Sequence, residues 1–312
     1  MPEYHRPVLL NETIALLDPK QGGVYLDATL GGGGHSVELA KRIGSGGTLI
    51  GIDRDSEAIE HTSKRLEGFE CKKILVEGNF RDLRSILDTH GISELDGALF
   101  DFGVSSHQLD SARGFSFSRE EPLDMRMGTD ARSAAQIVNE YAESDLARVI
   151  RDYGEERYAR RIAKAIVGQR ANKRIETTTE LASIAVSAIP GGGRWQDIHP
   201  ATRTFQAIRI EANAELEAIE EAVPAAVDML KVGGVVATIS FHSLEDRIVK
   251  TVFRRLSGRC ECPPRLPACV CGARRLVRVL TPKPIAPSDE EIESNPRSRS
   301  AKLRAAMRVS ED

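Results

Sequence analysis

Short apolar runs alternate with amphipathic stretches over the first hundred residues of the chain. The apolar runs are too short for ordinary helices and are rich in aliphatic residues, which predicts buried strands, whereas the stretches between them have helical spacing. The predicted strands are 24–27, 48–53, 73–76 and 97–101, and the predicted helices are 35–43, 56–66 and 83–87. Strands that alternate with helices predict a mostly parallel, doubly wound α/β sheet with helices on both faces.

A long helical segment separates the fourth of these strands from the next one, 234–240. Asp101 and Val235 are 134 positions apart (235 − 101), and a crossover needs only one helix, so on the order of a hundred residues are surplus to the sheet. The segment has apolar residues at helical spacing and a helix-capping pattern at 177–180. We therefore predict a discontinuous sheet domain, 1–110 with 215–312, and an inserted helical domain, 111–214. A helix at 243–256 and strands at 275–280 and 302–309 complete the sheet domain.

Composition places the chain among ordinary globular proteins. Its 312 residues are 41% hydrophobic and 29% charged, and charges or glycines interrupt every apolar run. We therefore expect no membrane span and a cytoplasmic location, with cysteines that are reduced or bound to metal.

Basic residues are unevenly distributed, although the net charge is −3. Residues 247–283 hold ten Lys and Arg and a single acid, and residues 151–174 hold eight Lys and Arg and three acids. Basic patches on an acidic protein suit a polyanion such as a nucleic acid, because neutralised phosphates release counterions. Solvated helix faces are an equally weighted alternative.

A glycine cluster follows the first predicted strand, in the segment from Asp27 to His35. A dinucleotide-binding loop needs a third glycine where Ser36 or Val37 stands, and a phosphate-binding P-loop needs Lys where His35 stands. The remaining class carries an acid just before the glycines, where it can face the positive methionine end of S-adenosylmethionine. The loop therefore predicts that cofactor.

Polar or aromatic residues also follow the next strands. Asp53 lies 22 positions after Gly31 (53 − 31), close to the spacing at which an acid reaches ribose hydroxyls; its alternative role is to cap the helix that follows. Phe80 follows the third strand, where it could pack on adenine or in the core. Asp101 ends the fourth strand, where an acid can accept a hydrogen bond from an amine. Ligands of open sheets bind at these strand ends.

Four of the five cysteines lie within twelve residues, as Cys260, Cys262, Cys269 and Cys271. Four thiolates suit a tetrahedral zinc ion, but the Cys-x-Cys spacing is less typical than Cys-x-x-Cys. The sequence favours a structural zinc site and free thiols equally as interpretations of this cluster.

Long motifs in the same order along the chain resemble those of the bacterial 16S ribosomal RNA cytosine-N4 methyltransferases (the RsmH, or MraW, family). These motifs are His5–Leu10, Gly33–Ser36, Ile52–Asp55, Asp101–Ser106, Arg113–Phe117, Pro122–Met127, Tyr153–Arg157, His199–Gln206, Ser240–Arg247 and Asn295–Ser300. The resemblance implies N4-methylation of a cytidine in the decoding centre of 16S rRNA, within the small ribosomal subunit. It also implies a helical insertion and a cofactor site lined by Gly33, Gly34, His35, Asp53, Phe80, Asp101 and Gln108.

Asp101 is the candidate catalytic residue, which would hold the cytosine amine; pure cofactor binding is its competing role. His35, His199 and His242 are candidate proton acceptors. For each of them a structural role, as a hydrogen-bonding histidine at a helix start or in the core, is the favoured interpretation. The candidate contacts to RNA phosphates are Arg203, Arg209, Arg247, Arg297 and Arg299, with ion pairs inside the protein as the alternative.

A different class of function stays open at this stage, namely an RNA- or ribosome-binding assembly factor with a vestigial cofactor pocket. So does an enzyme that methylates DNA or a protein amine, which only the resemblance disfavours. The sequence leaves the oligomeric state open between monomer and homodimer.

Overall fold

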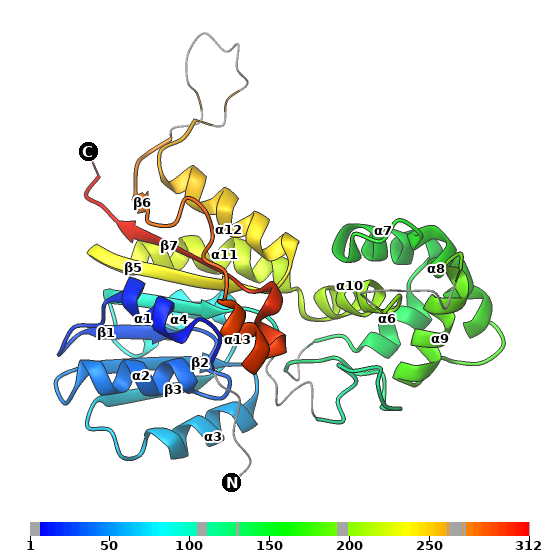
Figure 1. The fold of residues 1–312 in the computed structure, drawn as a ribbon, viewed down its shortest axis with the longest axis horizontal. Helices are drawn as coiled ribbons and strands as arrows, with labels where there is room; N and C mark the ends of the chain where they lie inside the picture. Colours follow the sequence, from blue (N-terminus) through cyan, green and yellow to red (C-terminus); the bar gives the residue numbers. More distant parts are fainter. Residues whose placement is uncertain are drawn as a thin grey trace. The chain divides into compact units, whose positions relative to one another are not determined.

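The chain folds into two compact units, Met1–Gly103 with Leu216–Asp312 and Val104–Glu215. The structure, a computed structural model, describes residues 7–104, 111–128, 131–191, 199–260, 262, 270 and 273–311. We describe each unit separately (Figure 1). No helix in these ranges is both long enough and apolar enough to span a membrane.

The first unit contains a seven-stranded sheet in the order β3-β2-β1-β4-β5-β7-β6. The first five strands pair in parallel, and β7 lies antiparallel between β5 and β6. The strands are β1 (Val24–Asp27), β2 (Thr48–Asp53), β3 (Lys72–Glu77), β4 (Leu95–Asp101), β5 (Leu230–Ser240), β6 (Val277–Val279) and β7 (Lys302–Arg308). The predicted doubly wound, mostly parallel sheet is therefore confirmed. From β1 the chain adds β2 and β3 toward one edge of the sheet and then β4 and β5 toward the other, so the switch point lies between β1 and β4.

Helices cover this sheet. They are α1 (Leu10–Leu17), α2 (Gly34–Ile43), α3 (Ser56–Leu66), α4 (Leu83–Thr89), α11 (Glu215–Met229), α12 (Ser243–Leu256) and α13 (Asp289–Ser294), with short 3-10 helices η1 (Phe80–Asp82) and η2 (Pro296–Ser300). The predicted helices 56–66 and 243–256 have the bounds of α3 and α12, and the two C-terminal strands are present. The sequence interpretation missed α1, α11 and α13.

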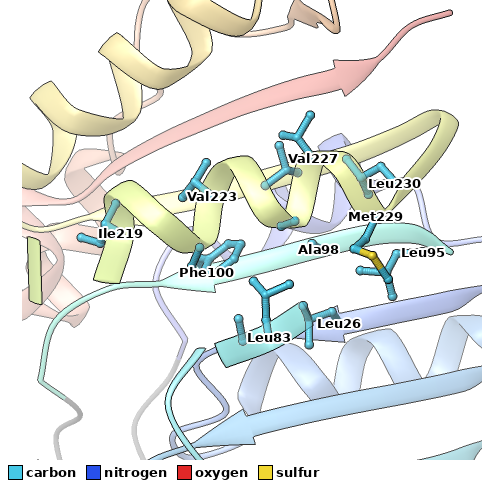
Figure 2. Close-up of a cluster of buried hydrophobic side chains, with 14 of the residues drawn as sticks. Leu26, Leu83, Leu95, Ala98, Phe100, Ile219, Val223, Val227, Met229 and Leu230 are labelled. Carbon is cyan, nitrogen blue, oxygen red and sulfur yellow. The ribbon is translucent and has the colours of Figure 1, made fainter. Parts of the chain in front are cut away.

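Alternating strand residues build a separate core on each face of the sheet. Ile50 and Phe100 pack with α4, α11 and α12, whereas their neighbours Leu49 and Leu99 pack with α1, α2 and α3. Figure 2 shows the first of these cores, with Val223 of α11 above Phe100. Both faces are buried because successive side chains of a strand point to opposite sides.

The second unit is helical. Its helices are α6 (Ala134–Glu140), α7 (Glu143–Gly154), α8 (Ala159–Arg170), α9 (Thr178–Ala188) and α10 (Thr202–Asn213). The predicted cap at Thr177 is present: its side chain accepts the N–H of Glu180, whose carboxylate accepts the N–H of Thr177. Helices α7 and α10 approach closely at Gly154, where a Cβ would lie 2.5 Å from the carbonyl oxygen of Arg203.

Candidate functional site

The loop between β1 and α2 takes a conformation that requires glycine. Gly33 has a φ of 72°, and a Cβ built there would lie 2.6 Å from the side chain of Thr62. A Cβ on Gly34, the first residue of α2, would lie 2.8 Å from the Pro7 ring. Thr62 of α3 also donates a hydrogen bond to the carbonyl of Gly31, at 3.1 Å. The glycines therefore let this loop lie directly against its neighbours.

Asp27 ends β1 just before this loop and is almost completely buried. Its carboxylate accepts a hydrogen bond from the Ser36 hydroxyl at 2.7 Å and one from the Thr29 N–H at 3.3 Å. Burial raises the pKa of Asp27 to about 7, and the nearby Asp53 contributes in the same direction. The end of β1 thus carries a carboxyl that is costly to ionise in the free protein.

Asp53 ends β2, and its carboxylate connects the end of this strand with the loop that follows β1. One of its oxygens accepts the N–H of Gly31 at 2.7 Å, and the other accepts the N–H of Asp55 at 2.9 Å. The cap of α3 is Asp55, whose side chain accepts the N–H of Glu57, so the alternative that Asp53 caps this helix is wrong. Burial raises the pKa of Asp53 to about 6.

Asp101 ends β4, and its backbone N–H donates to the hydroxyl of Thr29 at 2.5 Å. One carboxyl oxygen is buried and has no hydrogen-bond partner in the described part of the chain. The other lies 3.8 Å from Nδ1 of His35. Burial raises the pKa of Asp101 well above its ordinary range, and the charges of Asp27 and Glu245 raise it further.

His35 is a neutral neighbour of Asp101. Its ring is buried, and its Nε2 lies 3.2 Å from the carbonyl oxygen of Val8. Burial lowers the pKa of His35 to about 4, so the ring carries no charge near neutral pH. Because a carbonyl only accepts, Nε2 holds the ring proton and Nδ1 is left as an acceptor toward Asp101.

Three acids therefore gather at the carboxyl ends of β1, β2 and β4: Asp27 is buried, and Asp53 and Asp101 are half-buried. Within the described ranges, no Lys or Arg nitrogen lies within ion-pair distance of Asp27, Asp53 or Asp101. Buried carboxylates without a positive partner are expensive, and a bound cation near them would lower their pKa. Strongly shifted groups in such a place are typical of binding or catalytic sites. The arrangement suits a ligand that carries positive charge.

Phe80 follows β3 and packs against the core on one side. Its ring centroid lies 5.8 Å from that of Phe100 and 6.0 Å from that of Phe102. The ring is only half-buried, so it keeps surface that a ligand could cover. The remaining cofactor residue of the sequence interpretation, Gln108, lies outside the described residues.

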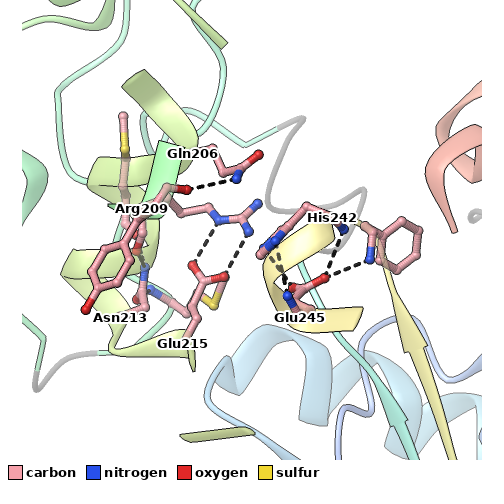
Figure 3. Close-up of polar contacts among 10 residues, drawn as sticks. Gln206, Arg209, Asn213, Glu215, His242 and Glu245 are labelled. Carbon is pink, nitrogen blue, oxygen red and sulfur yellow. Dashed lines mark hydrogen bonds and ion pairs between the residues drawn. The ribbon is translucent and has the colours of Figure 1, made fainter. Parts of the chain in front are cut away.

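His242 and His199 both serve as local structural groups. His242 caps α12: its Nδ1 lies 3.5 Å from the N–H of Glu245, and the Glu245 carboxylate accepts the N–H groups of Phe241 and His242 (Figure 3). His199 accepts the N–H of Ala201 at 3.2 Å. These contacts agree with the helix-start alternative for both residues.

The five candidate RNA-binding arginines differ in their surroundings. Arg209 makes two hydrogen bonds to Glu215, at 2.9 and 2.8 Å, and both side chains are largely buried (Figure 3). Arg209 therefore forms an ion pair inside the protein, which was the alternative to a phosphate contact in the sequence analysis. Its partner is Glu215. Arg203 is exposed and donates to the carbonyl of Glu155 at 3.1 Å. Arg247 on α12 and Arg297 and Arg299 on η2 are exposed as well.

The cysteine cluster is described only in part. Cys269 and Cys271 lie outside the described residues. Cys260 is exposed, Cys262 is half-buried, and the N–H of Cys262 donates to Sγ of Cys260 at 3.4 Å. A zinc site at these four residues stays a prediction.

Sequence reasoning missed three members of the acidic site. Thr29 orients the end of β4, Ser36 holds Asp27, and Glu245 adds negative charge near Asp101. Thr29 and Ser36 flank the glycines, so their position in the loop was an available signal. Glu245 lies 144 positions after Asp101 (245 − 101), and only the pairing of β4 with β5 brings it near.

Comparison with known proteins places these residues in a family. The family model described as the MraW methylase family matches residues 3–309. A relative from Pelobacter propionicus, named ribosomal RNA small subunit methyltransferase H, is 52% identical over 98% of both chains. A relative of the same name from Carboxydothermus hydrogenoformans is 51% identical, also over 98% of both chains. A solved structure, a putative rRNA methylase from Clostridium thermocellum, has a TM-score of 0.46 at 12% identity over 98% of this chain and 99% of that one. The chain belongs to the MraW methylase family.

Proposed function

We propose that the protein transfers the methyl group of S-adenosylmethionine to N4 of a cytidine in the decoding centre of 16S rRNA, within the small ribosomal subunit. The observation that carries the proposal is the full-length match to the family, together with relatives of about half-identical sequence that are named small subunit methyltransferases. A match over nearly the whole of both chains makes the assembly-factor and DNA-methylating alternatives unnecessary.

The acidic strand ends support S-adenosylmethionine as the methyl donor. The cofactor supplies a methyl group on a positively charged sulfur, and its methionine end adds an ammonium group. Asp27 is buried, and Asp101 is half-buried with one buried oxygen. Neither has a Lys or Arg partner in the described ranges, so a positive ligand would offset the cost of ionising them. Gly33, Gly34, His35, Asp53, Phe80, Asp101 and Gln108 are the residues that we propose to hold it.

Asp101 is the group that we propose to touch the cytosine amine. The amine is a poor nucleophile because its lone pair is delocalised into the ring, so orientation matters more than strong base catalysis. The buried Asp101 oxygen without a protein partner in the described ranges is free to accept a hydrogen bond from that amine. Asp27 and Glu245 raise the proton affinity of Asp101, which favours its uptake of the proton that the amine loses.

Asp101→Asn tests this role, with Asp53→Asn as the matched control. We expect Asp101→Asn to bind the cofactor with a nearly unchanged Kd and to lose roughly 10²–10⁴-fold in turnover. Asp53→Asn should instead weaken cofactor binding and keep turnover at saturation, because its proposed partner is a ribose hydroxyl. Loss of cofactor binding by Asp101→Asn with intact turnover at saturation would contradict the amine role.

The acceptor is tested with small subunits from cells that lack the enzyme. Incubation with the purified protein and labelled S-adenosylmethionine should label one cytidine, and mapping of the modified nucleotide should locate it in the decoding centre of 16S rRNA. Absence of transfer to subunits at every assembly stage would favour the assembly-factor alternative.

We also propose that the inserted helical region, 111–214 in the sequence interpretation, recognises the RNA substrate. Arg203, Arg247, Arg297 and Arg299 are candidate phosphate contacts on the two units, and Arg209 is the weakest candidate because it pairs with Glu215. Phosphate contacts should make RNA affinity fall steeply with salt.

A further inference from the structure

Helix α8 of the inserted unit carries an uninterrupted basic face. Residues 157–175 contain no Asp or Glu. Their Lys and Arg residues are Arg157, Arg160, Arg161, Lys164, Arg170, Lys173 and Arg174. The apolar residues Ile162, Ala163 and Ile166 point into the core of the unit, which leaves the charged positions for the opposite side of α8. The positive charges of this face lie in the first half of α8, at Arg160, Arg161 and Lys164.

Two of these cations have a structural role. The guanidinium of Arg170 donates to the carbonyls of Val138 and Tyr141, at 2.7 and 2.6 Å, at the C-terminal end of α6. Lys173 forms an ion pair with Glu180 at 2.6 Å. Neither group is available for an external partner without breaking these contacts.

The other members of this face are exposed and remain available. Arg160, Arg161 and Lys164 are all exposed, and in the described ranges none of them has an acid within ion-pair distance. At about 100° per residue they fall within an arc of about 100° on one side of α8. Arg157, in the turn before the helix, is also exposed and lies over the Tyr158 ring, 4.6 Å from its centroid. We call Arg157, Arg160, Arg161 and Lys164 the α8 ridge.

A groove of about 500 Å³, lined by both polar and apolar residues, lies between α8 and α9 beside the ridge. Gln169 and Arg174 line it from the α8 side, and Ser183 and Ser187 line it from α9; all four are exposed. Its lining offers amide, guanidinium and hydroxyl groups, which can hydrogen-bond to phosphate and to ribose hydroxyls. The lining also includes the apolar Ile175 and Ile184 and the carboxylate of Glu180, which pairs with Lys173.

We propose that the α8 ridge and the adjoining groove bind the sugar-phosphate backbone of the RNA substrate. The inference rests on the proposed function, and it assigns the contact to residues that differ from the arginines chosen from the sequence. Unpaired cations on one helical face favour a polyanion, and the hydroxyl-lined groove beside them favours RNA over an acidic protein surface. The contact is independent of base sequence, so it contributes affinity and orientation rather than choice of nucleotide.

The test neutralises the ridge in the full-length protein. The triple variant R160Q/R161Q/K164Q removes three positive charges and keeps good helix formers. Its binding to a protein-free 16S rRNA fragment that contains the decoding region is measured between about 50 and about 200 mM salt. Each lost phosphate contact should reduce the slope of log affinity against log salt by about 0.7, so the triple variant should lose about 2 in slope and about tenfold or more in affinity.

Two control variants separate charge from structure. K41Q/R42Q/K64Q removes the same charge from exposed positions on α2 and α3, and it should retain the slope of the unmodified protein. R160K/R161K/K164R keeps the charge of the ridge and should retain most of the affinity. An unchanged slope in the ridge variant, or an equal loss in the α2 and α3 control, would overturn the proposal. So would a loss of affinity for small subunits that is absent with the protein-free fragment, since this result would indicate a ribosomal protein as the partner.

Methyl transfer to small subunits distinguishes this inference from the proposed function. At subsaturating small subunits the ridge variant should transfer methyl groups more slowly than the unmodified protein, in proportion to its loss of RNA affinity, while its Kd for S-adenosylmethionine stays unchanged because the acidic site lies in the other unit. If the unmodified protein itself transfers none, the proposed function fails. If it is active and the ridge variant binds RNA equally well, only the present inference fails.

Discussion

The replacement of Asp27 by Asn tests the electrostatics of the acidic strand ends. Burial raises the pKa of this carboxyl from 3.8 to about 7 in the folded protein. Below about pH 4 it is protonated in both the folded and the unfolded chain, and it contributes nothing to the pH dependence of stability. As the pH rises from about 4 to about 7, the unfolded chain loses this proton and the folded chain keeps it, so stability falls.

The size of this effect follows from the shift. A change of about 3 pKa units corresponds to roughly 4 kcal/mol of lost stability above pH 7, at about 1.4 kcal/mol per unit. Asp27→Asn removes the charge and can keep both local hydrogen bonds: its amide oxygen accepts from the Thr29 N–H, and its NH₂ donates to the Ser36 hydroxyl. The variant should therefore be up to roughly 4 kcal/mol more stable at pH 8, which is on the order of 8 °C in Tm.

Thermal unfolding of the cofactor-free protein, followed by circular dichroism from pH 5 to pH 8, measures this difference. The two Tm curves should converge at low pH and separate as the pH rises. Asp88→Asn, at an exposed position on α4, is the control and should follow the unmodified protein. Calorimetry should show weaker binding of S-adenosylmethionine to Asp27→Asn, because the negative charge that faces the cofactor is lost. Parallel Tm curves for the unmodified protein and Asp27→Asn would refute the reasoning.

Two further substitutions test the glycine loop and the inserted unit. Gly33→Ala should destabilise the protein by roughly 1–3 kcal/mol in urea unfolding and weaken cofactor binding, since φ is positive and the new Cβ meets Thr62, whereas Gly68→Ala, where a Cβ meets open space, should change neither. Arg209→Ala leaves the largely buried Glu215 unpaired and should lower stability by roughly 3 kcal/mol, and R209M/E215L should recover most of it, as measured by thermal unfolding. Reduced RNA affinity of Arg209→Ala with unchanged stability would instead support the phosphate contact.

Local sequence was enough for the strands and for several helices of the sheet unit. Strand β2 and helix α3 have the predicted bounds because β2 is a short continuous apolar run and the stretch after it has helical spacing. The glycine loop could also be predicted from the sequence, since its conformation depends on residues adjacent in sequence. Helix α1 was missed although it buries Ile14 and Leu17 against the sheet, because its eight residues offer only two turns of pattern.

Tertiary structure decided the chemistry of the individual groups. The sequence placed Asp27, Asp53 and Asp101 at strand ends, but their raised pKa values depend on burial and on each other, and Glu245 joins them only through the pairing of β4 with β5. Likewise, the sequence showed the basic content of the segment around Lys164 without showing which cations were already paired. Periodicity is a property of neighbouring residues and can be read along the chain. Proton affinity and the availability of a charge depend on groups that only folding brings within a few ångströms, and these had to come from the structure.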